Sequence, residues 1–119
     1  MTQETSTHTV GQHFAACTPA VRAVYDRILD AAKRFGPVRE EPKKTSIHLA
    51  NKTAFAGVAT RKSALILTLK SATDLLSSRV VKHERVSAHR WHLEVRLDDP
   101  AQVDAEMEGW LKSAFELAG

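Results

Sequence analysis

The sequence predicts an α+β domain, an antiparallel sheet of about five strands with N- and C-terminal helices packed on one face. Leucines occupy every second position in residues 63–70, as in a strand with one buried face. Two segments near the ends of the chain carry apolar residues at helical spacing. Between them, strand-like segments follow one another through short turns, which favours hairpins and places both helices on the same side of the sheet.

Length and composition indicate one folded domain. The chain has 119 residues, of which 43% are hydrophobic and 26% charged, as in ordinary soluble proteins. We expect a flexible N-terminal arm over residues 1–12 and a single domain over residues 13–119. No apolar run is long enough to cross a bilayer, and the polar first residues lack the layout of a secretory signal. We therefore expect a cytoplasmic protein without membrane contact, and its single cysteine, Cys17, cannot form an internal disulfide.

The first long helix is predicted to begin after Thr18. Before it, residues 9–16 are expected to form a short helical turn anchored by Phe14. Thr18 offers an N-cap oxygen, and Pro19 suits the first helical position because that position needs no hydrogen-bond donor. An apolar stripe follows at spacings of three and four: Val21, Val24, Tyr25, Ile28, Leu29, Ala32 and Phe35. Gly36-Pro37 then ends the helix, since proline cannot extend it.

The strands begin after this helix. Residues 38–42 are expected to form a short edge strand or an extended link, because proline cannot donate to a sheet ladder. Residues 46–49 and 54–59 are predicted as strands, the second of them a run of small residues around one phenylalanine. The leucine-rich residues 63–70 form the middle of the sheet. Residues 71–78 interrupt the series as a helical turn or a loop that brings two leucines to the core.

The last two strands are predicted to form a hairpin. Residues 91–97 alternate apolar and polar side chains, the pattern of a half-buried strand. Neither face of residues 80–86 is fully apolar, which favours an edge strand. The turn between them is expected at residues 87–90.

The final helix is predicted to start at Asp99-Pro100, with Gln102 completing a capping box. A second apolar stripe follows at helical spacing: Val103, Met107, Trp110, Leu111, Ala114, and Leu117 or Ala118. This stripe should dock on the sheet beside the first helix. The opposite face of the sheet then meets water or a partner.

Several different short motifs are spread along nearly the whole chain. They are His13-Phe14, Gly36-Pro37-Val38, Lys44-Thr45, Phe55-Ala56-Gly57-Val58, Arg61-Lys62, His89, Trp110-Leu111 and Ala114-Phe115. In these motifs the chain resembles an uncharacterised family of bacterial domains, the domain of unknown function 5655. Similar domains also occur joined to other modules, which implies an accessory or binding role. The resemblance implies no reaction.

Basic charge is concentrated in the strands. Residues 43–96 hold eleven Lys or Arg and three acids, a net charge of +8, whereas residues 97–119 have a net charge of −5. Part of the acidic charge has a structural explanation, since acids are favoured at the start of a helix. The alternation predicts these side chains on the uncovered sheet face: Ser46, His48, Thr68, Lys70, His92, Glu94 and Arg96. Further donors fall at strand ends and turns: Lys43, Lys44, Thr45, Arg61, Lys62, His89 and Arg90.

These residues favour a small non-enzymatic binding module without a cofactor. Its ligand would be an anionic small molecule or an acidic protein segment, bound by the basic sheet face or the strand-end rim. The predicted ligand-binding residues are Lys44, Thr45, His48, Arg61, Lys62, His89, His92 and Arg96. A solvated sheet face, with lysines that protect an edge from aggregation, would show the same pattern.

Three other functions are open: nucleic-acid binding, catalysis and self-assembly. Nucleic acid is less favoured, because Trp91 falls on the apolar face and no aromatic platform for bases is present. No metal site is predicted, since the spacing of His89 and His92 on a strand sends their rings to opposite faces. A small enzyme that relies on histidine or on a metal is an alternative, with His48 and His83 as further candidates. Self-assembly into a homodimer, through a sheet edge or the acidic last helix, is another.

Overall fold

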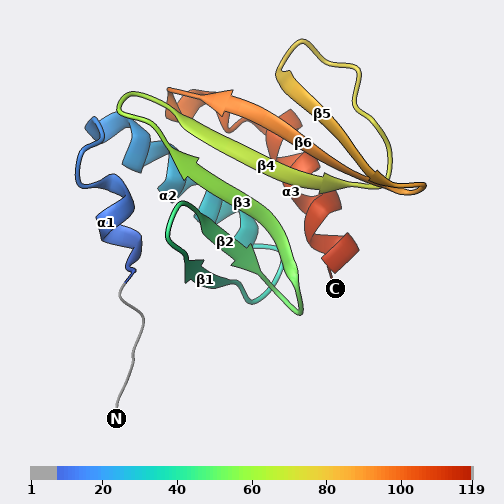
Figure 1. Ribbon diagram of the computed structural model, residues 1–119, viewed down its shortest axis with the longest axis horizontal. Helices are drawn as coiled ribbons and strands as arrows, with labels where there is room; N and C mark the ends of the chain where they lie inside the picture. Colours follow the sequence, from blue (N-terminus) through green and yellow to red (C-terminus); the bar gives the residue numbers. More distant parts are fainter. Residues whose placement is uncertain (1–7, 119) are drawn as a thin grey trace.

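Helices cover one face of an antiparallel six-stranded sheet in the computed structural model, which describes residues 8–118 (Figure 1). The strands are β1 (Arg39–Pro42), β2 (Ile47–Ala50), β3 (Ala54–Thr60), β4 (Leu65–Ser71), β5 (Val80–Ser87) and β6 (Arg90–Leu97), and their spatial order is β1-β2-β3-β4-β6-β5. The helices are α1 (Val10–Phe14), α2 (Pro19–Lys33) and α3 (Ala105–Ala118), with a 3-10 turn η1 (Pro100–Gln102) before α3. The predicted α+β class is confirmed. The sheet has six strands rather than about five, because β1 forms a full antiparallel ladder with β2.

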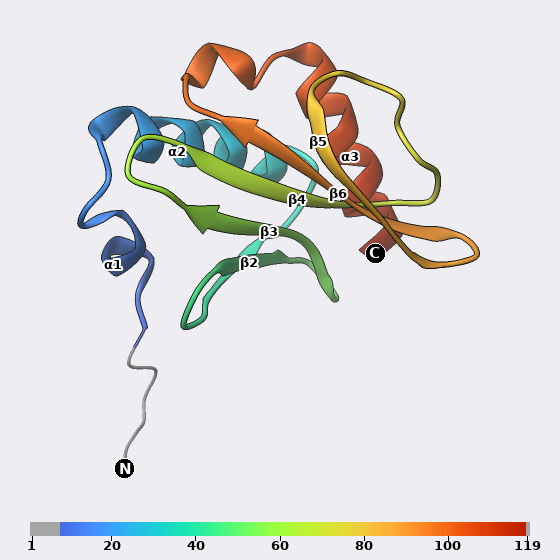
Figure 2. The same cartoon turned by 45° about the horizontal axis from the view of Figure 1, so that its top comes forward.

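The leucines of β4 form the centre of the core. Leu65, Leu67 and Leu69 lie opposite Leu97, Val95 and Leu93 of β6, and all six side chains are buried. Helices α2 and α3 lie on this side of the sheet, as the turned view shows (Figure 2). Burying each of these side chains stabilises the fold by roughly 1.5–3 kcal/mol. The predicted arrangement, with both helical stripes on the leucine face, is therefore confirmed.

Helix α1 lies at the start of the domain. Thr9 and Gln12 form a capping box, in which the backbone amide of Gln12 donates to the Thr9 hydroxyl over 3.2 Å. Phe14 is buried as predicted, and its ring centroid lies 5.0 Å from that of Tyr25. Because α1 starts at Val10, it takes up the last part of the predicted arm, while residues 1–7 lie outside the described residues.

Helix α2 begins at Pro19, as predicted, but the predicted Thr18 side-chain cap is wrong. The Thr18 hydroxyl makes no capping hydrogen bond; its backbone amide instead donates to the Lys62 carbonyl over 2.8 Å, which ties the helix start to the β3–β4 turn. Further along, the buried Tyr25 hydroxyl donates to Glu40 Oε2 over 2.5 Å and links α2 to β1. Burial, and then this hydrogen bond, raise the pKa of Tyr25, so it stays protonated.

The predicted final helix is two pieces rather than one. The capping box of Asp99 and Gln102 is present, but it caps only η1. Val103 then leaves the helical conformation at φ −85° and ψ 70°, with its side chain fully buried. Asp104 Oδ1 accepts a hydrogen bond from the Met107 amide over 3.1 Å and caps α3. Burial of Val103 and this second cap explain the break.

Arg79 joins the β4–β5 loop to the start of α3. Its guanidinium donates to Asp104 Oδ1 over 3.0 Å and to Glu106 Oε1 over 2.9 Å. It also donates to the Gln102 carbonyl over 2.6 Å and lies 5.7 Å from the ring centroid of Trp110. The loop is therefore held against the helix layer by one arginine.

The same loop corrects one prediction. Leu75 packs against the core, but Leu76 is 94% exposed, so only one of the two expected leucine contacts forms. The loop then leads into β5, which is the predicted edge strand of a hairpin with β6. The β5–β6 register shifts at Val81 and again at Val86, and these valines are exposed. Such bulges limit pairing of this edge with another strand.

We predict that Asp104 stabilises the fold above pH 4 and not in strong acid. The Met107 amide, followed by the Arg79 guanidinium, holds the pKa of Asp104 below its ordinary value of 3.8. A lowered pKa stabilises the folded state above the unfolded value, and this contribution is lost as the pH falls through the folded value. Asp104→Asn should therefore lower the urea midpoint at pH 7, and its gap to wild type should shrink below pH 3.8. Asp30→Asn, which removes an exposed carboxylate of α2, is the control; a gap that is constant with pH would contradict the assignment.

We further predict opposite effects of alanine at two glycines. A Cβ on Gly36 would lie 2.9 Å from Phe115 Cζ. That ring cannot easily move, since its centroid lies 6.0 Å from Phe35 and 5.3 Å from Phe55. Gly36→Ala should therefore destabilise by about 1–3 kcal/mol. Gly109→Ala, in open space within α3, should stabilise by about 0.5–1 kcal/mol. Urea unfolding measures both, and equal effects would show that Phe115 does not restrict Gly36.

Candidate functional site

A shallow groove of about 340 Å³ runs along β3 on the sheet face that the helices leave uncovered. Its floor is made of the small residues of β3, chiefly Ala54, Gly57 and Ala59. Polar side chains from β2 and the turn before it lie on one side, and polar side chains from β4 and β6 lie on the other. These are Ser46, His48, Thr68, Lys70 and His92.

Gly57 gives the groove its depth. It lies directly between His48 of β2 and Thr68 of β4, which are its partners in the two ladders. Adjacent strands are about 4.8 Å apart, so a residue without a side chain leaves a gap between two flanking side chains. A Cβ on Gly57 would lie 3.9 Å from His48 Cδ2 and 3.9 Å from Thr68 Cβ, in ordinary contact with both. The run of small residues in 54–59 was the sequence signal for this gap.

Two of the eight predicted ligand residues, His48 and His92, lie in the groove. Four more lie in turns at one end of the sheet: Lys44, Thr45, Arg61 and Lys62. The register brings these turns to the same end, because Ile47 at the start of β2 pairs with Val58 near the end of β3. His13 Nε2 donates to the Lys43 carbonyl over 2.8 Å and holds one of the turns. The groove therefore has exposed basic residues beyond its Ala59 end.

The other two predicted residues lie apart from this end or are paired. His89 is in the β5–β6 turn at the opposite end of the sheet, where Trp91 pairs with Ser71 at the end of β4. Arg96 is exposed on β6 and donates to Asp98 Oδ2 over 3.3 Å. The basic rim expected from the sequence is thus divided between two ends of the sheet.

Among residues 8–118, Lys70 is the lysine at the groove, and its ammonium has no partner there. On the strands beyond it, Lys82 lies 3.8 Å from Glu94, and His92 Nδ1 lies 3.8 Å from Glu84. Within residues 8–118, Lys70 forms neither an ion pair nor a side-chain hydrogen bond. The alternation of side chains predicted Lys70 on this face, but Lys70 was not among the predicted ligand residues. Whether a lysine on the sheet has an acidic neighbour depends on which strands lie beside it, and the sequence does not show this.

Within residues 8–118, the histidines of the sheet lie in different strands and turns. His83 Nδ1 lies 2.5 Å from Asp74 Oδ1, on the β5 edge, and His89 is exposed in its turn. Across residues 8–118, no three His, Cys, Asp or Glu side chains are placed to hold one metal ion. His48 and His92 share the groove, where both can act as hydrogen-bond donors or acceptors.

A protein-family model matches residues 10–118, and its description is domain of unknown function (DUF5655). The chain belongs to the DUF5655 family. The match begins at the first residue of α1 and ends at the last residue of α3, so it covers the helices and all six strands of this DUF5655 domain. No match was found among curated proteins or among solved structures. Over the described part of the chain, no helix is both long and apolar enough to span a membrane.

We predict that Gly57→Ala folds and fills part of the groove. The new Cβ meets its neighbours at 3.9 Å, so no clash arises. Replacing a strand glycine reduces the entropy lost on folding, and the variant should be more stable by about 0.5–1 kcal/mol. Urea unfolding measures the gain, and a loss of more than 1 kcal/mol would contradict the groove geometry.

Proposed function

We propose that this DUF5655 chain is a small non-enzymatic binding module that holds an anionic small molecule in the groove along β3. The observation that carries the proposal is the Lys70 ammonium, unpaired within residues 8–118, beside a recess floored by alanine and glycine. The carboxylate or phosphate of a ligand would meet Lys70 and the ring N–H of His92, which pairs with Lys70 across β4 and β6, while His48, on the far side of β3, would contact another part of the ligand. A charge-assisted hydrogen bond of this kind contributes about 1.5–3 kcal/mol.

The surroundings of the groove support a ligand with both an anionic and an apolar part. Ser46 and Thr68 supply hydroxyl donors along the walls, and the alanines of β3 offer an apolar floor. Lys44 and Arg61, exposed in the turns at one end, add positive charge that attracts an anion over a longer range. An acidic protein segment is the second ligand that these turns would accept. We also propose that the protein acts in the bacterial cytoplasm.

We predict that inorganic phosphate binds at low salt and shifts the NMR amide signals of the groove. Signals of Thr68, Lys70 and His92 should move most, because their side chains line the recess. Lys70→Met should weaken binding by about tenfold, the effect of losing roughly 1.4 kcal/mol. Lys112→Met removes an exposed lysine of α3 and should leave binding unchanged.

Heparin retention on a column tests the turns separately. If they recruit anions, Lys44→Glu and Arg61→Glu should elute at lower salt than Lys112→Glu, which has the same net charge. Equal phosphate affinity of the Lys70→Met and Lys112→Met variants would overturn the groove proposal. Equal elution of the three glutamate variants would overturn the role of the turns.

A further inference from the structure

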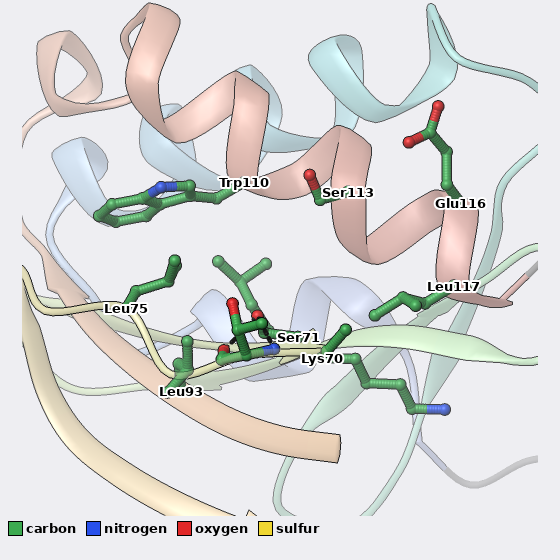
Figure 3. Close-up of a pocket in the computed structure, with 11 residues that line it drawn as sticks. Lys70, Ser71, Leu75, Leu93, Trp110, Ser113, Glu116 and Leu117 are labelled. Carbon is green, nitrogen blue, oxygen red and sulfur yellow. Dashed lines mark hydrogen bonds between the residues drawn. The ribbon is translucent and has the colours of Figure 1, made fainter. Parts of the chain in front are cut away.

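A second recess lies on the other side of the sheet, between α3 and the ends of β4 and β6 (Figure 3). Its volume of about 370 Å³ is within the range of small-molecule sites. Leu69 and Leu93 line it from the sheet, and Leu75 lines it from the β4–β5 loop. Trp110 and Leu117 line it from the helix. An apolar body of about the size of one aromatic ring would be enclosed by these side chains.

The walls of this cleft are held in place without a ligand. The Arg79 guanidinium, 5.7 Å from the ring centroid of Trp110, fixes the half-buried indole from one side. Ser71 Oγ donates to the Thr73 carbonyl over 2.6 Å and orders the start of the loop. Figure 3 shows Trp110 and Leu75 facing each other at one end of the cleft. A planar molecule would therefore enter a preformed site and order few side chains on binding.

The charges around the cleft disfavour an anion. Glu116 lines its rim, and the Glu116 carboxylate forms no ion pair or hydrogen bond within residues 8–118. The charge of Arg79 is exceeded by Asp104 and Glu106, which both bind it. Lys70 also lines the cleft, but its side chain extends away from Trp110 (Figure 3). A ligand with a positive group is thus better matched to this side of the sheet than a neutral or anionic one.

We infer that this cleft binds a small aromatic amine. The ring packs against Trp110 among Leu75 and Leu93, where an aromatic pair adds to the burial of apolar area. The ammonium lies at the rim that Glu116 and the exposed Ser113 line; the Glu116 carboxylate, directed away from Trp110 in Figure 3, attracts it through solvent rather than by direct contact. The cleft is separate from the groove along β3 and has the opposite charge preference.

Three probes with one phenyl ring test the charge preference: 2-phenylethylamine, 2-phenylethanol and phenylacetate. The chain has two tryptophans, so a Trp91→Phe background leaves Trp110 as the single fluorophore in the cleft. We predict that the amine changes Trp110 emission at the lowest concentration, the alcohol at about two- to fivefold higher concentration, and phenylacetate at the highest. Trp110 emission that responds to none of the three, or to phenylacetate first, would overturn the inference.

Variants then assign the contacts. Glu116→Gln should bring the amine to the affinity of the alcohol and leave the alcohol unchanged, whereas Asp30→Asn should change neither. Ser113→Leu, at an exposed helix position, should weaken all three probes by filling the cleft. Lys70→Met removes the proposed anion contact of the groove and should not weaken the amine, so failure of one site is distinguishable from failure of the other. An amine preference that survives Glu116→Gln would also overturn the inference.

Discussion

Burial of one face of the sheet, and only one, is the constraint on which the rest of the molecule depends. Leucines of β4 and their partners on β6 cannot remain in water, so α2 and α3 cover them. Three long apolar stripes, one on the sheet and one on each of the helices α2 and α3, are thereby buried together in a single core. The opposite face keeps its polar side chains, and its shape is set by residue size along β3 rather than by any covering element.

The helix layer does not seal the sheet completely. Because α3 starts at a second cap, Asp104, its direction is set after the buried Val103 rather than at Asp99. Arg79 then holds the β4–β5 loop against that helix start. Between this loop, α3 and the end of β4 a cleft is left, and Trp110 forms one of its walls. The same contacts that stabilise the helix start therefore define a recess.

The charge segregation seen along the chain becomes a segregation between faces. Lys70 lines the groove, with exposed basic turn residues beyond one end of it, while Glu116 of α3 lines the cleft on the helix side. Local contacts change this picture in detail: Glu94 lies 3.8 Å from Lys82 and Glu84 lies 3.8 Å from His92, whereas Lys70 has no ion-pair partner within residues 8–118. The two proposed sites lie on opposite faces of the sheet and are proposed to have opposite charge preferences.

The sequence by itself determined the α+β class, the helical stripes and the buried leucine face, because alternation and helical spacing are local properties that burial enforces. It also located the β5–β6 hairpin and the polar face. Only the tertiary structure decided that Gly57 lies between His48 and Thr68, since this depends on the register of three strands. Strand order likewise separated His89 from the turn of Lys44, and burial of Val103 divided the last helix. Such features arise from contacts between residues distant in sequence, whose register and packing a local pattern does not specify.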